Sequence, residues 1–78
     1  MKKMKTELAL LMQTDGKPAM PLDKVAENLG ISARTLENKL YAKASPVKMF
    51  KMGSGWFAHV SDVAAYIDER RAAAEVAA

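Results

Sequence analysis

The 78-residue sequence contains no cysteine, which excludes disulfide bonds and metal sites built on thiolates. A chain without cysteine suits the reducing cytoplasm, and we expect the protein to reside there. There is a single histidine, His59, with no carboxylate cluster beside it. The sequence therefore predicts no metal site and gives His59 a structural or surface role.

Long apolar runs are also missing, and no segment approaches the roughly 18 apolar residues of a membrane span. The N-terminus begins with lysines, but Glu7 interrupts its apolar part and no small-residue cleavage site follows, so no signal peptide is predicted. No Ser/His/Asp arrangement, phosphate-binding glycine loop or paired-carboxylate motif is present. We therefore predict that the protein is not an enzyme and has no cofactor.

Half of the residues are hydrophobic, which is enough for a folded core and too many for a disordered tail. The length allows one small domain. We expect that domain to span residues 6–74, with a flexible basic N-terminus at residues 1–5 and a frayed tail at residues 75–78.

The stretch that organises the chain is Leu22–Leu40, with the sequence LDKVAENLGISARTLENKL. Val25, Ala26 and Leu29 form an apolar stripe on a first short helix. Gly30 stands where the backbone must leave that helix, since glycine adopts a positive φ at no steric cost. This is the pattern of a DNA-binding helix-turn-helix.

The second helix of this motif is predicted over Ser32–Lys43, with Ser32 as its N-cap. Ala33, Leu36 and Leu40 turn inward, and Lys39 occupies a position that is usually apolar, so Leu40 takes the inward role one residue later. The N-terminal part of a recognition helix faces the major groove. The outward residues predicted to read bases are Ser32, Arg34, Thr35 and Asn38.

Basic residues concentrate in the same region of the chain. Between residues 31 and 57 there are five basic residues against one acid, Glu37, which gives a local net charge of +4 within a chain of net charge +3. Phosphate backbones attract such a concentration. Glu37 either accepts from a cytosine or pairs with Arg34 or Lys39, and the second role is commoner. The predicted phosphate and wing contacts are Lys39, Lys43, Lys48, Lys51 and Ser54.

A wing is predicted after the second helix, which Pro46 helps to end. One strand covers Val47–Met52, a turn follows at residues 53–55, and Trp56–Val60 form the return strand. The two aromatic residues at positions 56 and 57 point to opposite faces of their strand, and we favour Phe57 as the core residue.

Two outer helices complete the predicted fold. Thr6–Gln13 is expected to be helical, with a strand as the competing interpretation, and its inner face is predicted to carry Leu8, Leu11 and Met12. Two prolines leave room for a short extended segment at residues 19–20. Ser61 is expected to cap the last helix over Asp62–Ala74. Its inner face is predicted to consist of Val63, Ala64, Tyr66 and Ile67. The fold class is mainly α with a small β-hairpin, a winged helix-turn-helix in the order α-(β)-α-α-β-β-α.

Two segments carry a resemblance to a known family. Residues 6–40, TELALLMQTDGKPAMPLDKVAENLGISARTLENKL, and residues 61–73, SDVAAYIDERRAA, resemble the pyocin transcriptional-activator family. They also resemble the wider group of small phage-type winged helix-turn-helix proteins, which includes excisionases, AlpA-like and MerR-like regulators. The resemblance implies a cytoplasmic, nucleoid-associated DNA-binding protein of bacteria or their mobile elements, acting on promoters or attachment sites.

Three functions follow from these patterns. The first is a sequence-specific transcriptional regulator, an activator, of a prophage or mobile element. The second is an excisionase, which would bend attachment-site DNA cooperatively so that an integrase excises. The third is a protein-interaction module that binds a protein through the alanine-rich last helix. The expected partners are double-stranded DNA and further copies of the chain in a dimer or array, with integrase or RNA polymerase as further candidates.

Overall fold

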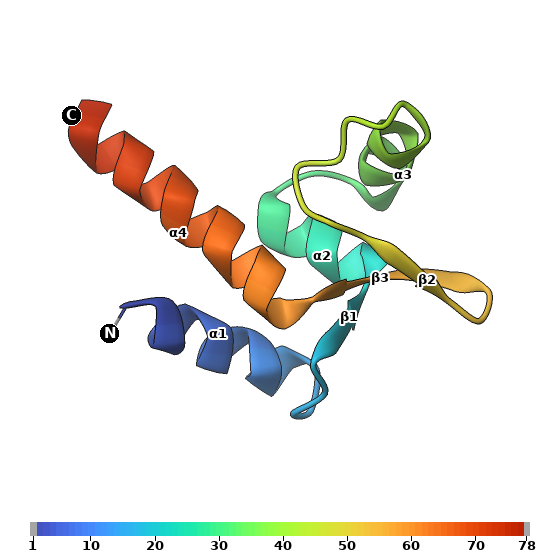
Figure 1. Cartoon of the computed structure of the whole chain (residues 1–78), viewed down its shortest axis with the longest axis horizontal. Helices are drawn as coiled ribbons and strands as arrows, with labels where there is room; N and C mark the ends of the chain where they lie inside the picture. Colours follow the sequence, from blue (N-terminus) through green and yellow to red (C-terminus); the bar gives the residue numbers. More distant parts are fainter. Residues whose placement is uncertain (1, 78) are drawn as a thin grey trace.

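The computed structural model describes the backbone of residues 2–77 and the side chains of residues 6–75. The chain forms α1 (Lys2–Gln13), β1 (Ala19–Pro21), α2 (Leu22–Leu29), α3 (Ala33–Tyr41), β2 (Phe50–Met52), β3 (Gly55–His59) and α4 (Val60–Ala77). This mainly helical fold with a small antiparallel sheet confirms the predicted fold class and the predicted order of elements. In Figure 1, α1 and α4 lie side by side at one end, and α3 and the β2–β3 hairpin occupy the other.

The sheet has three antiparallel strands in the order β1-β3-β2. Met20 pairs with Ala58 across β1 and β3, and both side chains are fully buried. Side chains alternate between the faces of a strand, so this pair identifies the face of the sheet that is covered by the helices. The opposite face carries Phe57, paired with Pro21 on one side and with Phe50 on the other.

The core lies between the covered face of the sheet and the helices. Its largest fully buried side chains are Met20, Leu36, Val25, Val60 and Val63. Val25 and Leu36 belong to the two helices of the predicted helix-turn-helix, so the motif is held by the same core that closes the sheet.

Helix α1 differs from its prediction in length and in the face that it buries. It begins at Lys2, so the residues predicted to be flexible are helical from Lys2 to Lys5, and Met1 lies outside the described residues. Leu8 and Met12 are 61% and 77% exposed, so the prediction that they lie on the inner face of α1 is wrong. The third residue predicted for that face, Leu11, is half-buried against the core.

The inward side of α1 instead carries Thr6 and Leu10, and Thr14 continues this row just after the helix ends; the three residues stand four positions apart. Leu10 and Thr14 are buried, and the Thr6 hydroxyl donates to Asp68 Oδ1 of α4 at 2.7 Å. The bond places the Thr6 side of α1 against α4, and Leu8 and Met12, on the other side of the helix, therefore face outward.

Helix α4 begins at Val60, two residues before its predicted start, and extends to Ala77 through most of the tail predicted to fray; Ala78 lies outside the described residues. The prediction that Ser61 caps it is wrong. The Nδ1 atom of His59 accepts from the Ser61 backbone N–H at 3.1 Å, so the histidine satisfies a donor of the first turn. The predicted inner face is confirmed: two of its residues are buried and two pack against the core, namely Val63, Ala64, Tyr66 and Ile67.

The first wing strand is shorter than predicted, because β2 pairs with β3 only from Phe50 to Met52. Val47 is buried in the core without belonging to a strand, and the Ser45 hydroxyl donates to its carbonyl oxygen at 2.7 Å. The apolar residues before Phe50 therefore belong to a loop that is anchored in the core, and they do not extend the strand.

Candidate nucleic-acid interface

The turn between α2 and α3 is closed by hydrogen bonds around Gly30, whose φ is +76°. The Ile31 N–H donates to the Ala26 carbonyl at 3.0 Å, and the Gly30 N–H donates to the Glu27 carbonyl at 3.2 Å. These two bonds form a Schellman motif, which ends a helix by pairing its last free carbonyls. The predicted role of Gly30 is confirmed, and the motif sets the direction in which α3 leaves α2.

Helix α3 begins after Ser32, whose hydroxyl oxygen accepts from the Thr35 backbone N–H at 3.1 Å. The hydroxyl groups of Ser32 and Thr35 are also hydrogen-bonded to each other at 2.8 Å. Two of the four residues predicted to read bases therefore stabilise the helix start as well. The remaining two, Arg34 and Asn38, are exposed, and their side chains have no hydrogen-bond or ion-pair partner within residues 6–75.

The inward and outward faces of α3 follow the predicted register. Leu36 is fully buried, Leu40 is half-buried, and Lys39 is exposed, as the one-residue shift requires. Tyr41 is 72% exposed. The helix ends at Tyr41, two residues before the predicted end, and Lys43 follows with a φ of +56°.

The predicted phosphate contacts lie on α3, on the loop after it and on the hairpin. All of them are exposed, namely Lys39, Lys43, Lys48, Lys51 and Ser54. The ion pairs within the described side chains, Lys24–Glu27 and Arg71–Glu75, involve none of these residues. Glu37 is exposed and pairs with neither Arg34 nor Lys39, so the commoner of its two predicted roles is not observed.

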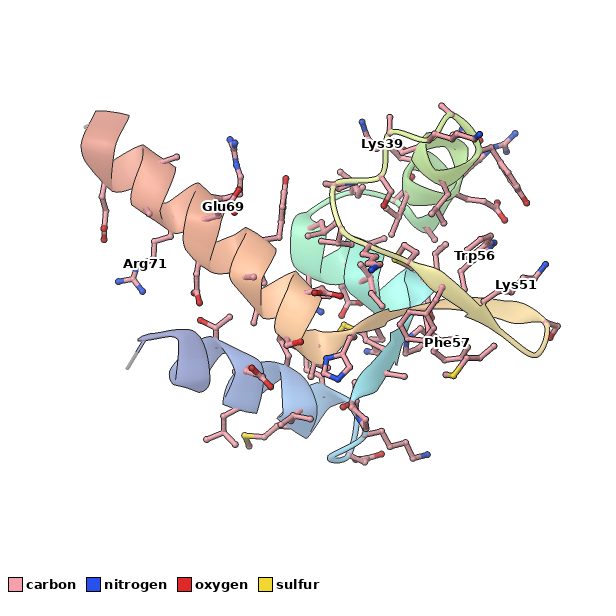
Figure 2. All side chains as sticks on the ribbon, viewed as in Figure 1. Lys39, Lys51, Trp56, Phe57, Glu69 and Arg71 are labelled. Carbon is pink, nitrogen blue, oxygen red and sulfur yellow. The ribbon has the colours of Figure 1, made fainter. Side chains whose placement is uncertain are left out.

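On the hairpin, Lys51 stands opposite Trp56, and the Lys51 Nζ atom lies 5.9 Å from the centre of the Trp56 ring. Both side chains lie on the same face of the sheet as Met20 and Ala58, and Figure 2 shows Trp56 on the α3 side of the hairpin and Phe57 on the other side. The cationic side of the hairpin is therefore the side that looks toward α3.

The expectation that Phe57 is the core residue is wrong, because Trp56 and Phe57 are both half-buried and Ala58 takes the buried position of β3. The predicted opposite orientation of the two aromatic side chains is confirmed.

Sequence reasoning missed the contact between Lys51 and Trp56, although the turn contains its signal. Gly53 has a φ of +62° and Ser54 does not have a positive φ, which is the pattern of a two-residue type II′ hairpin loop. Counting outward from a loop at residues 53–54 pairs Met52 with Gly55 and Lys51 with Trp56. Assigning the loop to residues 53–54, with glycine at its first position, would have predicted this register from the sequence.

Within the described part of the chain, no three His, Asp or Glu side chains are grouped as a metal site would require. Among the described residues, no helix has both the length and the apolar character needed to cross a membrane.

Comparison with known protein families gives a match over most of the chain. The model of the family described as "Pyocin activator protein PrtN" matches residues 7–74, which is most of the chain. No curated protein and no solved structure matches. The matched region begins within α1, ends within α4 and includes every element between them.

Proposed function

This chain belongs to the pyocin activator protein family, and from that membership we propose that it is a transcriptional activator that binds double-stranded DNA sequence-specifically. Helix α3 enters the major groove, and the β2–β3 hairpin contacts the adjacent backbone as a wing. The description of the family as an activator favours regulation of transcription over the excision of mobile DNA.

The observation that carries this proposal is a set of exposed polar and cationic side chains, without hydrogen-bond or ion-pair partners among the described residues, on α3 and the hairpin at one end of the molecule. Arg34 and Asn38 extend from α3, and Lys51 lies on the α3 side of the hairpin. Arginine binds guanine and asparagine binds adenine in bidentate geometry, whereas lysine binds phosphate without sequence preference. The arrangement thus combines groups that specify a base sequence with groups that supply affinity.

The Arg34→Ala variant tests the assignment of base reading. We expect it to weaken binding to the preferred site by about tenfold to a hundredfold, because one bidentate base contact contributes about 1–3 kcal/mol of discrimination. Binding to unrelated DNA should change by less than about threefold. The measurement is a titration of both DNAs at the same salt concentration, after the preferred site has been selected from random sequences.

Arg71→Ala is the matched control, because Arg71 lies on α4 and pairs with Glu75 at 3.6 Å. It should leave both affinities unchanged. Equal losses on specific and unrelated DNA in Arg34→Ala would contradict base reading by Arg34. Failure of the unsubstituted chain to prefer any DNA sequence would contradict the proposed function itself.

A further inference from the structure

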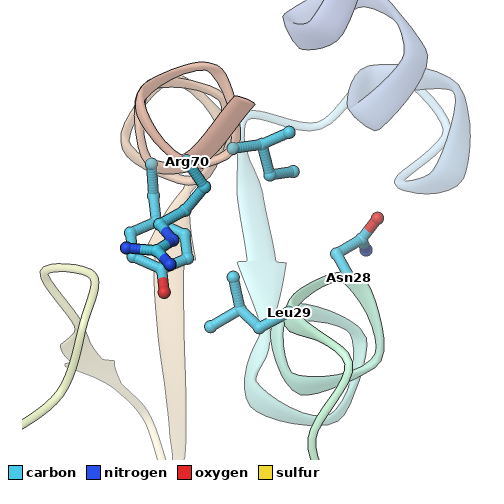
Figure 3. Close-up of a pocket in the computed structure, with 5 residues that line it drawn as sticks. Asn28, Leu29 and Arg70 are labelled. Carbon is cyan, nitrogen blue, oxygen red and sulfur yellow. The ribbon is translucent and has the colours of Figure 1, made fainter. Parts of the chain in front are cut away.

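A groove of about 310 Å³ lies between the C-terminal end of α2 and the middle of α4, away from the hairpin. Figure 3 shows Asn28 and Leu29 on α2 facing Arg70 on α4 across this space. Leu29 and Ile67 both pack against the core and form the apolar part of the lining. Arg70 is exposed and supplies the only cation of the lining.

One wall of the groove is held in place by its own hydrogen bonds. The Asn28 amide donates to Gln13 Oε1 at 2.9 Å and to the Lys24 carbonyl at 2.8 Å, and Gln13 Nε2 donates back to Asn28 Oδ1 at 3.1 Å. Asn28 therefore has little capacity left for a ligand.

The unused polar groups are on the other wall. Within residues 6–75, the Arg70 guanidinium and the Tyr66 hydroxyl have no hydrogen-bond or ion-pair partner. The neighbouring Arg71 differs, since it is paired with Glu75. Arg70 is thus the cation on this helix that remains available for an added carboxylate.

An unpaired guanidinium beside a tyrosine and two aliphatic side chains suits a carboxylate carried next to an apolar side chain. Arginine binds a carboxylate in bidentate geometry, and arginine and tyrosine are among the residues enriched at the energetic centres of protein interfaces. A DNA backbone fits less well, because phosphate contacts are made by several cations and gain nothing from an apolar floor.

We propose that this groove is the surface through which the DNA-bound activator contacts the transcription machinery. Its occupant is a protein segment in which Asp or Glu stands next to a large apolar residue. This inference rests on the proposed function, since an activator needs a second surface that stays open when DNA is bound. The α4 wall of the groove, which carries Arg70, stands apart from α3 and the hairpin in Figure 1, so a chain bound to DNA through those two elements leaves Arg70 accessible.

The test is an Arg70→Glu variant of the full chain, with Arg71→Glu as the matched control. Two quantities are measured on the same promoter: the affinity for its DNA, and the fold-activation of transcription by purified bacterial RNA polymerase holoenzyme at saturating activator. We expect Arg70→Glu to lower activation at least fivefold while the DNA affinity changes less than twofold. Arg71→Glu should change neither quantity more than twofold. Arg70→Ala should lower activation in the same direction by a smaller factor.

Two results would overturn the inference. Full activation by Arg70→Glu would show that the groove is not the docking site. A loss of DNA affinity in Arg70→Glu that matches its loss of activation, in a variant with an unchanged thermal unfolding transition, would place Arg70 at the DNA instead. If the unsubstituted chain shows no specific DNA binding, the proposed function fails first and this inference fails with it.

Discussion

Lys43 holds its backbone in the left-handed region, at a φ of +56°, where an ordinary L-residue is strained by about 1–2 kcal/mol. Its position explains the conformation. The Ala44 N–H donates to the Lys39 carbonyl at 2.7 Å, and the Lys43 N–H donates to the Leu40 carbonyl at 3.0 Å, so a second Schellman motif ends α3. Lys43 takes the place that Gly30 takes at the end of α2. Compared with a glycine, a lysine at this position makes the fold less stable but places a positive charge beside α3.

The Lys43→Gly variant should therefore be more stable and bind DNA less well. We expect its free energy of unfolding to rise by about 0.5–1 kcal/mol, the relief of left-handed strain less the added entropy of a glycine in the unfolded chain. The dependence of log affinity on log salt concentration should become less steep by about 1, because one phosphate contact is lost. Denaturant unfolding and DNA titrations at several salt concentrations measure the two effects.

Lys43→Ala separates charge from conformation, because it removes the ammonium group and keeps a Cβ. It should show the same change in salt dependence without the gain in stability. At the equivalent position of α2, Gly30→Ala should lower the free energy of unfolding by about 1–2 kcal/mol, since a positive φ disfavours alanine. Apart from the neighbouring residues in the chain, no atom lies within 4 Å of the added Cβ, so that loss would be conformational. Equal stability of the glycine and alanine variants at position 43 would contradict the strain argument.

At the scale of the elements, the β2–β3 hairpin contains a side-chain contact between its two strands. Trp56 presents its ring to the Lys51 ammonium, and such cation–π contacts contribute about 0.5–1 kcal/mol at exposed sites. The strand register places Lys51 on the side of the hairpin that faces α3, and the ring restricts the movement of this flexible side chain there. Trp56 is thus a positioning residue for the phosphate contact that we propose for Lys51.

The Trp56→Leu variant distinguishes positioning from charge. We expect the DNA affinity to fall by about twofold to fivefold, which corresponds to the lost cation–π energy. The salt dependence should stay the same, because the Lys51 charge is still present. Lys51→Ala should instead reduce the salt dependence by about 1. Both quantities come from titrations over a series of salt concentrations.

Trp56→Phe is the conservative control, since it keeps an aromatic face and should lose less affinity than leucine. A thermal unfolding measurement on each variant shows whether the half-buried side chain at position 56 also affects stability. A salt dependence in Trp56→Leu that falls as far as in Lys51→Ala would show that Trp56 decides whether the contact forms at all, and would contradict a purely positioning role.

At the scale of the whole molecule, size limits how one copy can recognise DNA. The chain measures 38 × 28 × 16 Å, and one turn of B-DNA is about 34 Å long. One short recognition helix makes few base contacts, so useful specificity calls for two or more copies on repeated sites. Two copies of this size fit side by side on one face of DNA, one turn apart.

We therefore expect cooperative binding to two half-sites whose centres lie about 10 base pairs apart. Inserting 5 base pairs between the half-sites should lower the affinity of the pair on the order of tenfold, because the copies then face opposite sides of the DNA. Inserting 10 base pairs should restore part of the loss. Titrations with stoichiometry measured by sedimentation test this, and binding of one copy with no dependence on spacing would contradict it.

Much of the fold, and the placement of the candidate site on α3, could be predicted from patterns among residues close together in the sequence. The spacing of Val25, Ala26 and Leu29, the glycine after them and the serine that caps α3 each act within a few positions of the chain, so their effects can be predicted without knowing the fold. The faces of α3 and the order of the elements followed in the same way. The errors involve segments that local periodicity does not describe, such as the buried face of α1.

The sequence by itself determined that a helix-turn-helix stands in the middle of this protein, because that motif depends on backbone conformations and spacings set over a few residues. Only the tertiary structure decided the rest. Thr6 bonds to Asp68, 62 positions away, Ala58 takes the buried place beside two half-buried aromatic residues, and α2 and α4 enclose a groove with an unpaired arginine. Each of these features depends on how distant segments compete for one small core, and no local pattern records that competition.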